Sequence, residues 1–335
     1  MTVPFVLDRL FVEASSRSRA ETGYTVHAGH KKNWLDNDLP LRVFSGLLAE
    51  LTAVAVIRFQ GWGDPLANPE ILPMLAAAKK TGARVELVTD ASRFTDDHAN
   101  ALVRDGVDQV VFTMAGLSEE ANFRRRGTSL FSVLEAVSHL RTVRAVQQSR
   151  LPQIAARYTM TRSGFTAECD RLPDFLSRAG FEAASVRLLS YTTGTETEEE
   201  TVVPATDETY GLVRDRLTRL VAEAADCGLR LNSRVVNGGA TRFHCPDTPG
   251  SALFVAADGE VSPCPFRNVP VGLPAEYRFH GREFPFLHDV RGNLHTTPLA
   301  AIWNDPDYRE FRFKHDTDTP PEGCAGCWRS FLVTI

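Results

Sequence analysis

Short apolar runs alternate with amphipathic stretches over roughly the first two thirds of the chain. Six runs rich in β-branched and aromatic residues have the length and composition of strands: residues 5–13, 54–60, 85–89, 109–113, 153–160 and 185–190. Between them, leucines and valines recur at the three- and four-residue spacing of a helix, for example over residues 41–51 and 130–140. This order of consecutive βα units predicts an α/β fold.

Six βα units fall short of the eight in a closed barrel, so the pattern indicates an open partial barrel or a doubly wound sheet. Past Asn232 the residue pattern changes: Gly and Pro become more frequent, and apolar residues no longer recur at helical spacing. We therefore predict two domains, an α/β domain over 1–234 and a smaller domain over 235–335. The acidic segment 195–201, between a strand and the next helix, is expected to be a solvated loop.

Composition narrows the class of protein. A chain of 335 residues can bury a large core, and 37 Lys and Arg against 42 Asp and Glu leave a net charge of -5. This balance favours neither nucleic acid nor an anionic membrane as a partner. No run approaches the about 18 apolar residues of a membrane-spanning helix, so we expect a cytoplasmic protein. In such a reducing compartment, six cysteines indicate metal ligands rather than disulfides.

Four of these cysteines lie in the predicted C-terminal domain. Cys245 is followed by Cys264, and a Cys-x-x-Cys pair, Cys324 and Cys327, comes far downstream. Two residues between thiolates allow both sulfurs to face one metal from a tight turn. The set is complete for a four-thiolate site, and the chemistry of the ligands leaves zinc and an iron–sulfur cluster both open.

The surrounding sequence resembles the twitch form of the SPASM extension of radical S-adenosylmethionine (SAM) proteins. Gly259 stands five residues before Cys264 within Asp-Gly-Glu-Val, and Arg-Gly-Asn-Leu at 291–294 leads to Ala-Ile-Trp-Asn at 301–304. The resemblance implies that the four cysteines hold one auxiliary [4Fe–4S] cluster. It also implies a partial (β/α)6 barrel, similar to a TIM barrel, followed by the SPASM/twitch-type domain.

The resemblance continues in the barrel. Residues 60–66, Gln-Gly-Trp-Gly-Asp-Pro-Leu, stand where the family carries Gly-Gly-Glu-Pro, and residues 111–116 are similar to its Ser-x-x-Gly strand end. The resemblance therefore implies a vestigial SAM pocket, made by Gly61, Trp62, Gly63, Asp64 and Thr113. Glycines at the end of a strand allow the backbone to approach a ligand closely. Residues 88–91, Val-Thr-Asp-Ala, depart from the family's Thr-Asn-Gly, and whether SAM still binds stays open.

The chain departs from the family at the end of the first strand. Where radical SAM proteins carry Cys-x-x-x-Cys-x-x-Cys, the alignment places Ser18, Thr22 and Thr25. A hydroxyl is a harder and weaker ligand than a thiolate, so these residues should not hold the SAM-cleaving cluster. His27 and His30 follow at once, and imidazole ligands are the alternative, although such histidines are more often surface residues.

Arginines on the predicted strands give a second open question. Arg157 and Arg187 fall at positions that strand alternation turns inward, where a guanidinium needs a carboxylate or a bound anion. We expect internal salt bridges for both, with a substrate carboxylate or phosphate as the alternative. The run of arginines at 124–126 is expected to lie in a solvated loop.

Three functions are compatible with these residues. In the first, the chain is a radical-SAM-like protein without radical chemistry that acts as a scaffold or partner in peptide or natural-product modification. In the second, it is an enzyme that reuses the barrel cavity for non-radical chemistry on SAM or a small carboxylated substrate. In the third, its cluster relays electrons to an intact radical SAM homologue. The expected partners are a peptide, a carrier, a small molecule or such a homologue, and whether the chain is an enzyme stays open.

Overall fold

The computed structural model describes residues 6–20, 24–237, 245–317, 319–321, 323–325 and 327–335. One large sheet organises the molecule, with the strand order β12-β9-β8-β1-β2-β3-β4-β5-β6-β7-β13. Strands β1 to β8 pair in parallel with one another, whereas β9 pairs antiparallel with β8 and β12, and β13 pairs antiparallel with β7. The strands are β1 (Val6–Val12), β2 (Ala53–Phe59), β3 (Arg84–Thr89), β4 (Gln109–Met114), β5 (Gln153–Met160), β6 (Ala183–Leu188), β7 (Arg230–Val236), β8 (Ala252–Val255), β9 (Glu260–Ser262), β12 (Gly292–Asn293) and β13 (Leu332–Thr334).

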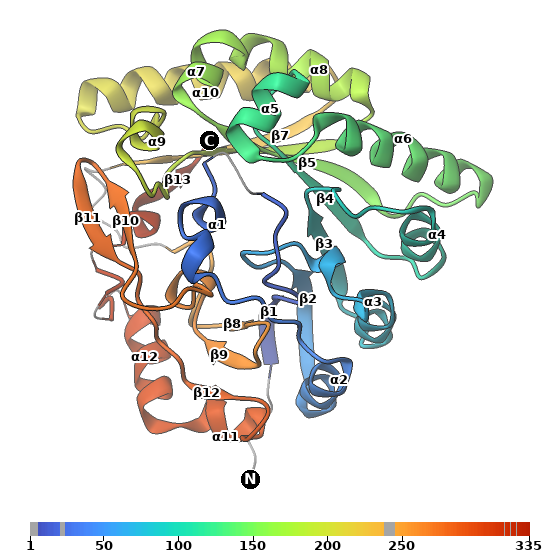
Figure 1. Ribbon diagram of the computed structural model, residues 1–335, viewed down its shortest axis with the longest axis vertical. Helices are drawn as coiled ribbons and strands as arrows, with labels where there is room; N and C mark the ends of the chain where they lie inside the picture. The colour runs from blue at the N-terminus through green and yellow to red at the C-terminus, as the bar shows by residue number, and fades with distance from the viewer. Residues whose placement is uncertain (1–5, 21–23, 238–244, 318, 322, 326) are drawn as a thin grey trace.

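Helices cover the convex side of this curved sheet, and α1 lies inside the arc (Figure 1). A separate two-stranded hairpin is formed by β10 (Glu276–Phe279) and β11 (Arg282–Pro285). The helices are α1 (Val26–Gly29), α2 (Leu41–Glu50), α3 (Ile71–Lys80), α4 (Asp96–Arg104), α5 (Glu119–Arg126), α6 (Leu130–Val146), α7 (Arg162–Ala167), α8 (Leu172–Ala179), α9 (Thr195–Glu199), α10 (Asp207–Asp226), α11 (Leu299–Asn304) and α12 (Pro306–Asp316). None of the described helices is long and apolar enough to cross a bilayer.

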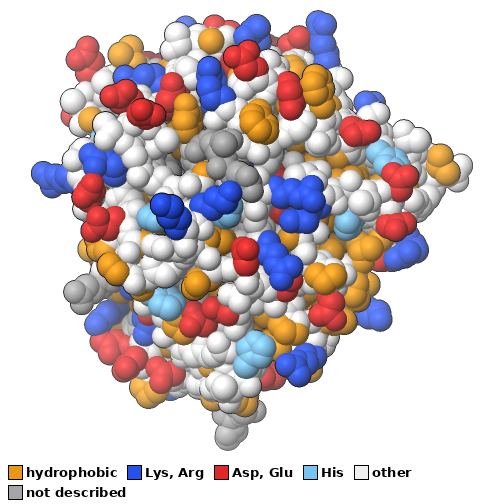
Figure 2. Space-filling model, viewed as in Figure 1, with side chains coloured by type: hydrophobic (Ala, Val, Ile, Leu, Met, Phe, Trp, Pro, Cys, Tyr) orange, Lys and Arg blue, Asp and Glu red, His pale blue; other side chains and the backbone are white. Residues whose placement is uncertain are grey.

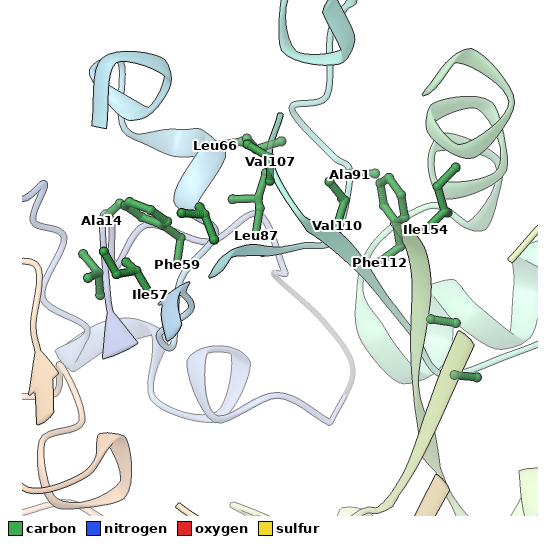
Figure 3. Close-up of a cluster of buried hydrophobic side chains, with 14 of the residues drawn as sticks. Ala14, Ile57, Phe59, Leu66, Leu87, Ala91, Val107, Val110, Phe112 and Ile154 are labelled. Atoms are coloured by element: carbon green, nitrogen blue, oxygen red, sulfur yellow. The ribbon is translucent and has the colours of Figure 1, made fainter. Parts of the chain in front are cut away.

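The main core fills the layer between the sheet and these outer helices. Ile57, Phe59, Leu87 and Phe112 point from their strands into this layer and are fully buried (Figure 3). The opposite face of the strands lines the interior of the arc, where small apolar side chains form a floor: Val88, Val111 and Ala155. Because side chains alternate along a strand, the same strands supply both the core and the interior.

All six predicted strands are confirmed within a few residues, and the α/β class is confirmed. Strand β7 was not predicted from the sequence. It pairs in parallel with β6 and spans Asn232, where the residue pattern changes. Alternation of Leu231, Ser233 and Val235, all buried, was the signal available for it. The later strands extend the same sheet, since β8 pairs with β1 and β13 with β7. The division into domains 1–234 and 235–335 stays a prediction.

Two segments expected to be solvated loops are helical and make specific contacts. The acidic segment forms α9, and Glu198 pairs with Arg278 of the hairpin at 3.0 Å. The arginine run forms the end of α5, where Arg125 is buried and donates to Glu168 at 2.8 Å. The expected loops were therefore wrong, and Glu198 and Arg125 are withdrawn from solvent because each faces a counter-charge.

Candidate functional site

A cavity of about 280 Å³ opens inside the arc, toward the carboxyl ends of the strands. The five residues of the predicted pocket all line it: Gly61, Trp62, Gly63, Asp64 and Thr113. In the face shown in Figure 2, Lys and Arg side chains lie across the middle of the molecule. The fold therefore assembles the segments that the sequence indicated at one site, as parallel sheets do with the residues that follow their strands.

The described hydroxyls among Ser18, Thr22 and Thr25, the positions compared above with cluster cysteines, are engaged by the local backbone. Ser18 and Thr25 line the cavity. The Ser18 hydroxyl accepts from the backbone N–H of Ala20 at 3.1 Å, and Thr25 caps α1 by accepting from Ala28 at 3.1 Å. Thr22 lies outside the described residues. Both described hydroxyls thus have the turn and cap roles typical of Ser and Thr.

The two neighbouring histidines face backbone carbonyls rather than each other. The Nδ1 of the buried His27 lies 2.9 Å from the carbonyl oxygen of Ala20, and the Nε2 of His30 lies 2.9 Å from that of Glu276. Within the described part of the chain no cluster of three or more His, Cys, Asp or Glu side chains has metal-binding geometry. Imidazole ligands therefore find no support here, and each histidine has a structural partner.

The close approach that Gly61 and Gly63 provide is to the segment after β1. A Cβ on Gly63 would lie 2.3 Å from the backbone carbonyl carbon of Ser16, and one on Gly61 would lie 2.3 Å from the Glu13 side chain. Backbone cannot yield as the end of a flexible side chain can, so Gly63 is required for packing. These glycines hold the loop after β2 against the loop after β1, beside the cavity.

Asp64 is a buried carboxyl at the cavity wall. Its Oδ2 accepts from the Thr89 hydroxyl at 2.7 Å and the Asp90 N–H at 2.8 Å, and its Oδ1 accepts from the Leu66 N–H at 2.8 Å. Burial raises the pKa of Asp64, and the adjacent Asp90 carboxylate raises it further. The position that would grip an amino group in the family is here partly committed to the protein's own loops.

Glu13 is a buried acid beneath the same loops, at the end of the first strand. Its Oε1 accepts from the Trp62 N–H at 2.6 Å and its Oε2 from the Ala257 N–H at 3.3 Å. Burial raises the pKa of Glu13 to about 7, although these hydrogen bonds act in the opposite direction. Glu13 therefore ties the loop after β2 to the chain following β8.

Trp62 links the two predicted domains at the cavity. Its indole N–H donates to the carbonyl of Pro265 at 2.9 Å, and its ring packs edge-on against Phe266 and Tyr191. Thr113, on β4, donates to the carbonyl of Thr89 at 3.3 Å. The cavity wall is thus apolar and aromatic toward the cysteine-bearing segment and polar toward β3 and β4.

Two of the four cysteines adjoin residues that line the cavity, since Cys264 directly precedes Pro265 and Cys327 directly precedes Trp328. Burial raises the pKa of Cys264 well above its usual range, and interaction with Cys245, Cys324 and Cys327 raises it further. Cys324 and Cys327 form one turn, with the Cys327 N–H donating to the Cys324 carbonyl at 3.1 Å. Four thiolates can ligate either a [4Fe–4S] cluster or a zinc ion. The described thiols do not form a group with metal-binding geometry.

A buried ion pair stands beside this set. Arg329 lies over the Phe266 ring and donates to Asp247 at 2.5 Å and 2.9 Å. Sequence reasoning missed the pair because its members are 82 residues apart. Their positions two residues from Cys327 and Cys245 were the available signal.

Comparison with known proteins agrees with this arrangement. Residues 245–328 match the model of the SPASM family, an iron–sulfur cluster-binding domain. The Pyrococcus furiosus tungsten-containing aldehyde ferredoxin oxidoreductase cofactor-modifying protein is 26% identical over 307 residues, which cover 91% of this chain and 83% of that protein. The PqqA peptide cyclase of Streptomyces rochei is 25% identical over 87% of this chain and 73% of its own length.

The fold agrees with a solved structure as well. The structure of anSMEcpe with bound AdoMet and the Cp18Cys peptide superposes with a TM-score of 0.63 and 16% identity, over 98% of this chain and 88% of that one. The chain thus combines an α/β fold shared with that structure and a C-terminal segment that matches an iron–sulfur cluster-binding domain. Over residues 245–328 the chain matches an iron–sulfur cluster-binding domain, and over most of its length it is similar to the cofactor-modifying protein and the peptide cyclase named above.

Proposed function

We propose that this chain acts in peptide modification as a binding scaffold or partner that does not cleave SAM by radical chemistry. The observation that carries the proposal is the identity of residues 18, 22 and 25, which are Ser, Thr and Thr where the resemblance to radical SAM proteins implies cluster-binding cysteines. A serine or threonine hydroxyl stays protonated near neutral pH and binds iron weakly. Without that cluster no electron reaches SAM.

The peptide part of the proposal draws on the relatives. One is named for cyclising the PqqA peptide, and the solved structure of anSMEcpe contains a peptide. In this chain the cavity has an aromatic side formed by Trp62, Tyr191 and Phe266 and a polar side formed by Asp64 and Thr113. A cavity with these two sides can bind both apolar and polar side chains of a peptide.

The C-terminal site would hold one [4Fe–4S] cluster on Cys245, Cys264, Cys324 and Cys327, with zinc as the alternative. Bound there, a cluster would supply one-electron transfer and would cross-link the last residues to the segments that precede β8 and follow β9. Arg267 donates to the Cys324 sulfur at 3.5 Å and pairs with Asp289 at 2.7 Å, so a cationic donor already faces the thiol. Such a donor stabilises thiolate charge.

Anaerobic incubation with dithionite and SAM tests the absence of radical chemistry. The protein, reconstituted with iron and sulfide, should release no 5′-deoxyadenosine above background and should contain about four irons per chain. A variant with cysteine restored at Ser18, Thr22 and Thr25 should bind about eight. Production of 5′-deoxyadenosine by the unsubstituted protein would refute the proposal, and about one zinc without sulfide would replace the cluster by zinc.

Asp64 gives the second candidate function its support. An acid whose pKa is raised by burial, at a cavity wall, is a candidate proton donor. Consumption of SAM with release of methylthioadenosine or S-adenosylhomocysteine, reduced in Asp64→Asn, would favour non-radical chemistry in the cavity over a scaffold. The scaffold predicts instead that SAM is recovered intact while a peptide encoded beside this gene binds.

A further inference from the structure

Three arginines project into the barrel interior from adjacent strands. Arg157 on β5, Arg187 on β6 and Arg234 on β7 all line the cavity. Arg187 is paired in register with Arg234, and Thr159, two residues after Arg157, is paired with Arg187. Residues paired across parallel strands point to the same face, so the three guanidiniums share one wall above the apolar floor.

The expected internal salt bridges for Arg157 and Arg187 are absent within the described part of the chain. Arg157 donates to the neutral amide oxygen of Gln60 at 2.9 Å, and its Nε is buried with no partner. Neither Arg187 nor Arg234 has a hydrogen bond or an ion pair with a described residue. A guanidinium carries five donors and stays charged in proteins, so these groups have large unused capacity.

The carboxylates nearest to this wall are already engaged elsewhere. Glu86 pairs with Arg58 and Arg84, and Asp247 pairs with Arg329 at 2.5 Å. Arg126, which also lines the cavity, has Asp64 and Asp90 as its counter-charges. Positive charge on the wall therefore exceeds the negative charge that the described residues supply.

Burial and repulsion between the arginines both act against the charged form of these side chains. Burial lowers the pKa of Arg157, and Arg187 and Arg58 lower it further; burial likewise lowers the pKa of Arg187. Like charges gathered in a half-buried cavity destabilise the protein in the absence of a ligand. Strain of this kind is typical of a binding site that a counter-charge completes.

We infer that Arg157, Arg187 and Arg234 form an anion-binding site, which takes a phosphate- or carboxylate-bearing ligand with two or more negative charges. Planar guanidiniums match both groups with paired hydrogen bonds. The charge has two sources, a small free anion or the acidic side chains of a bound peptide. The inference does not depend on the proposed function, because it rests on this wall and not on residues 18, 22 and 25.

Thermal unfolding and calorimetry of the full chain at constant ionic strength test the inference. The probes are inorganic pyrophosphate, citrate and a triglutamate peptide, with trilysine as the charge-reversed control. Pyrophosphate or citrate should raise the thermal midpoint if the ligand is a small anion, and triglutamate should be the stronger probe if it is a peptide. Loss of one charged hydrogen-bonding side chain should weaken binding about 10- to 100-fold.

The decisive variant is Arg187→Met, with Arg178→Met on exposed α8 as the matched control. Without any anion, Arg187→Met should raise the thermal midpoint, since it removes an unpaired cation, whereas loss of a structural salt bridge would lower it. Arg187→Met should also remove the midpoint increase caused by the anion, and Arg178→Met should keep it. If no anionic probe raises the midpoint of the unsubstituted protein, or if Arg187→Met keeps the full increase, the inference is wrong.

Discussion

Replacing Glu13 by glutamine tests how the loops around the cavity are held together. Glu13 is 1% exposed, and burial raises its pKa to about 7 from an ordinary value of 4.5. Between pH 4.5 and about pH 7, Glu13 is deprotonated in the unfolded chain but protonated in the folded chain. Rising pH in this range therefore destabilises the folded protein. At about 1.4 kcal/mol for each pH unit, the whole effect is about 3 kcal/mol, of which about 2 to 3 falls between pH 5 and pH 8.

Glutamine has nearly the same shape and does not titrate. It can still accept from the Trp62 N–H, but its amide group cannot accept from the Ala257 N–H, which costs about 1 kcal/mol. Glu13→Gln should therefore be about 1 kcal/mol less stable than the parent at pH 5 and more stable than the parent at pH 8. Urea unfolding of both proteins from pH 5 to pH 8 measures the difference, in which other titrating groups cancel.

Glu135→Gln, on the exposed face of α6, is the matched control and should leave the pH dependence of the parent unchanged. If Glu13→Gln and the parent keep a constant stability difference from pH 5 to pH 8, Glu13 does not titrate in this range. The account of a protonated, buried acid beneath the cavity would then be refuted.

Replacing Cys324 and Cys327 together by alanine should remove the bound metal, measured as iron or zinc per chain, and should leave the far-ultraviolet circular dichroism of the α/β sheet largely intact. Arg125→Met should destabilise the protein by about 3 to 5 kcal/mol in urea unfolding, because it leaves Glu168 buried without its cation; an effect below 1 kcal/mol would contradict this. Asn68→Ala should cost about 2 to 4 kcal/mol, since the Asn68 amide donates to the Ala14 carbonyl at 2.7 Å and to a second carbonyl at 2.9 Å.

The local sequence pattern was sufficient to predict much of the fold. Strand periods, helical spacing and a Cys-x-x-Cys pair are properties of neighbouring residues, so the six strands, the α/β class and the cysteine-bearing extension could be predicted from the sequence. The ordered segments around Gly61 and Thr113 also identified the cavity, because residues that follow parallel strands meet at one edge of the sheet.

Pairing between distant residues was decided only by the tertiary structure. Strand β7 acquires its role from β6 and β13, and Glu13 becomes a buried acid only when Trp62 and Ala257 close over it. An inward-pointing arginine looks the same in a sequence whether or not a carboxylate faces it. Arg187 has no such partner among the described residues because the fold directs Glu86 and Asp247 to other arginines, and electrostatic balance depends on distances that local sequence does not encode.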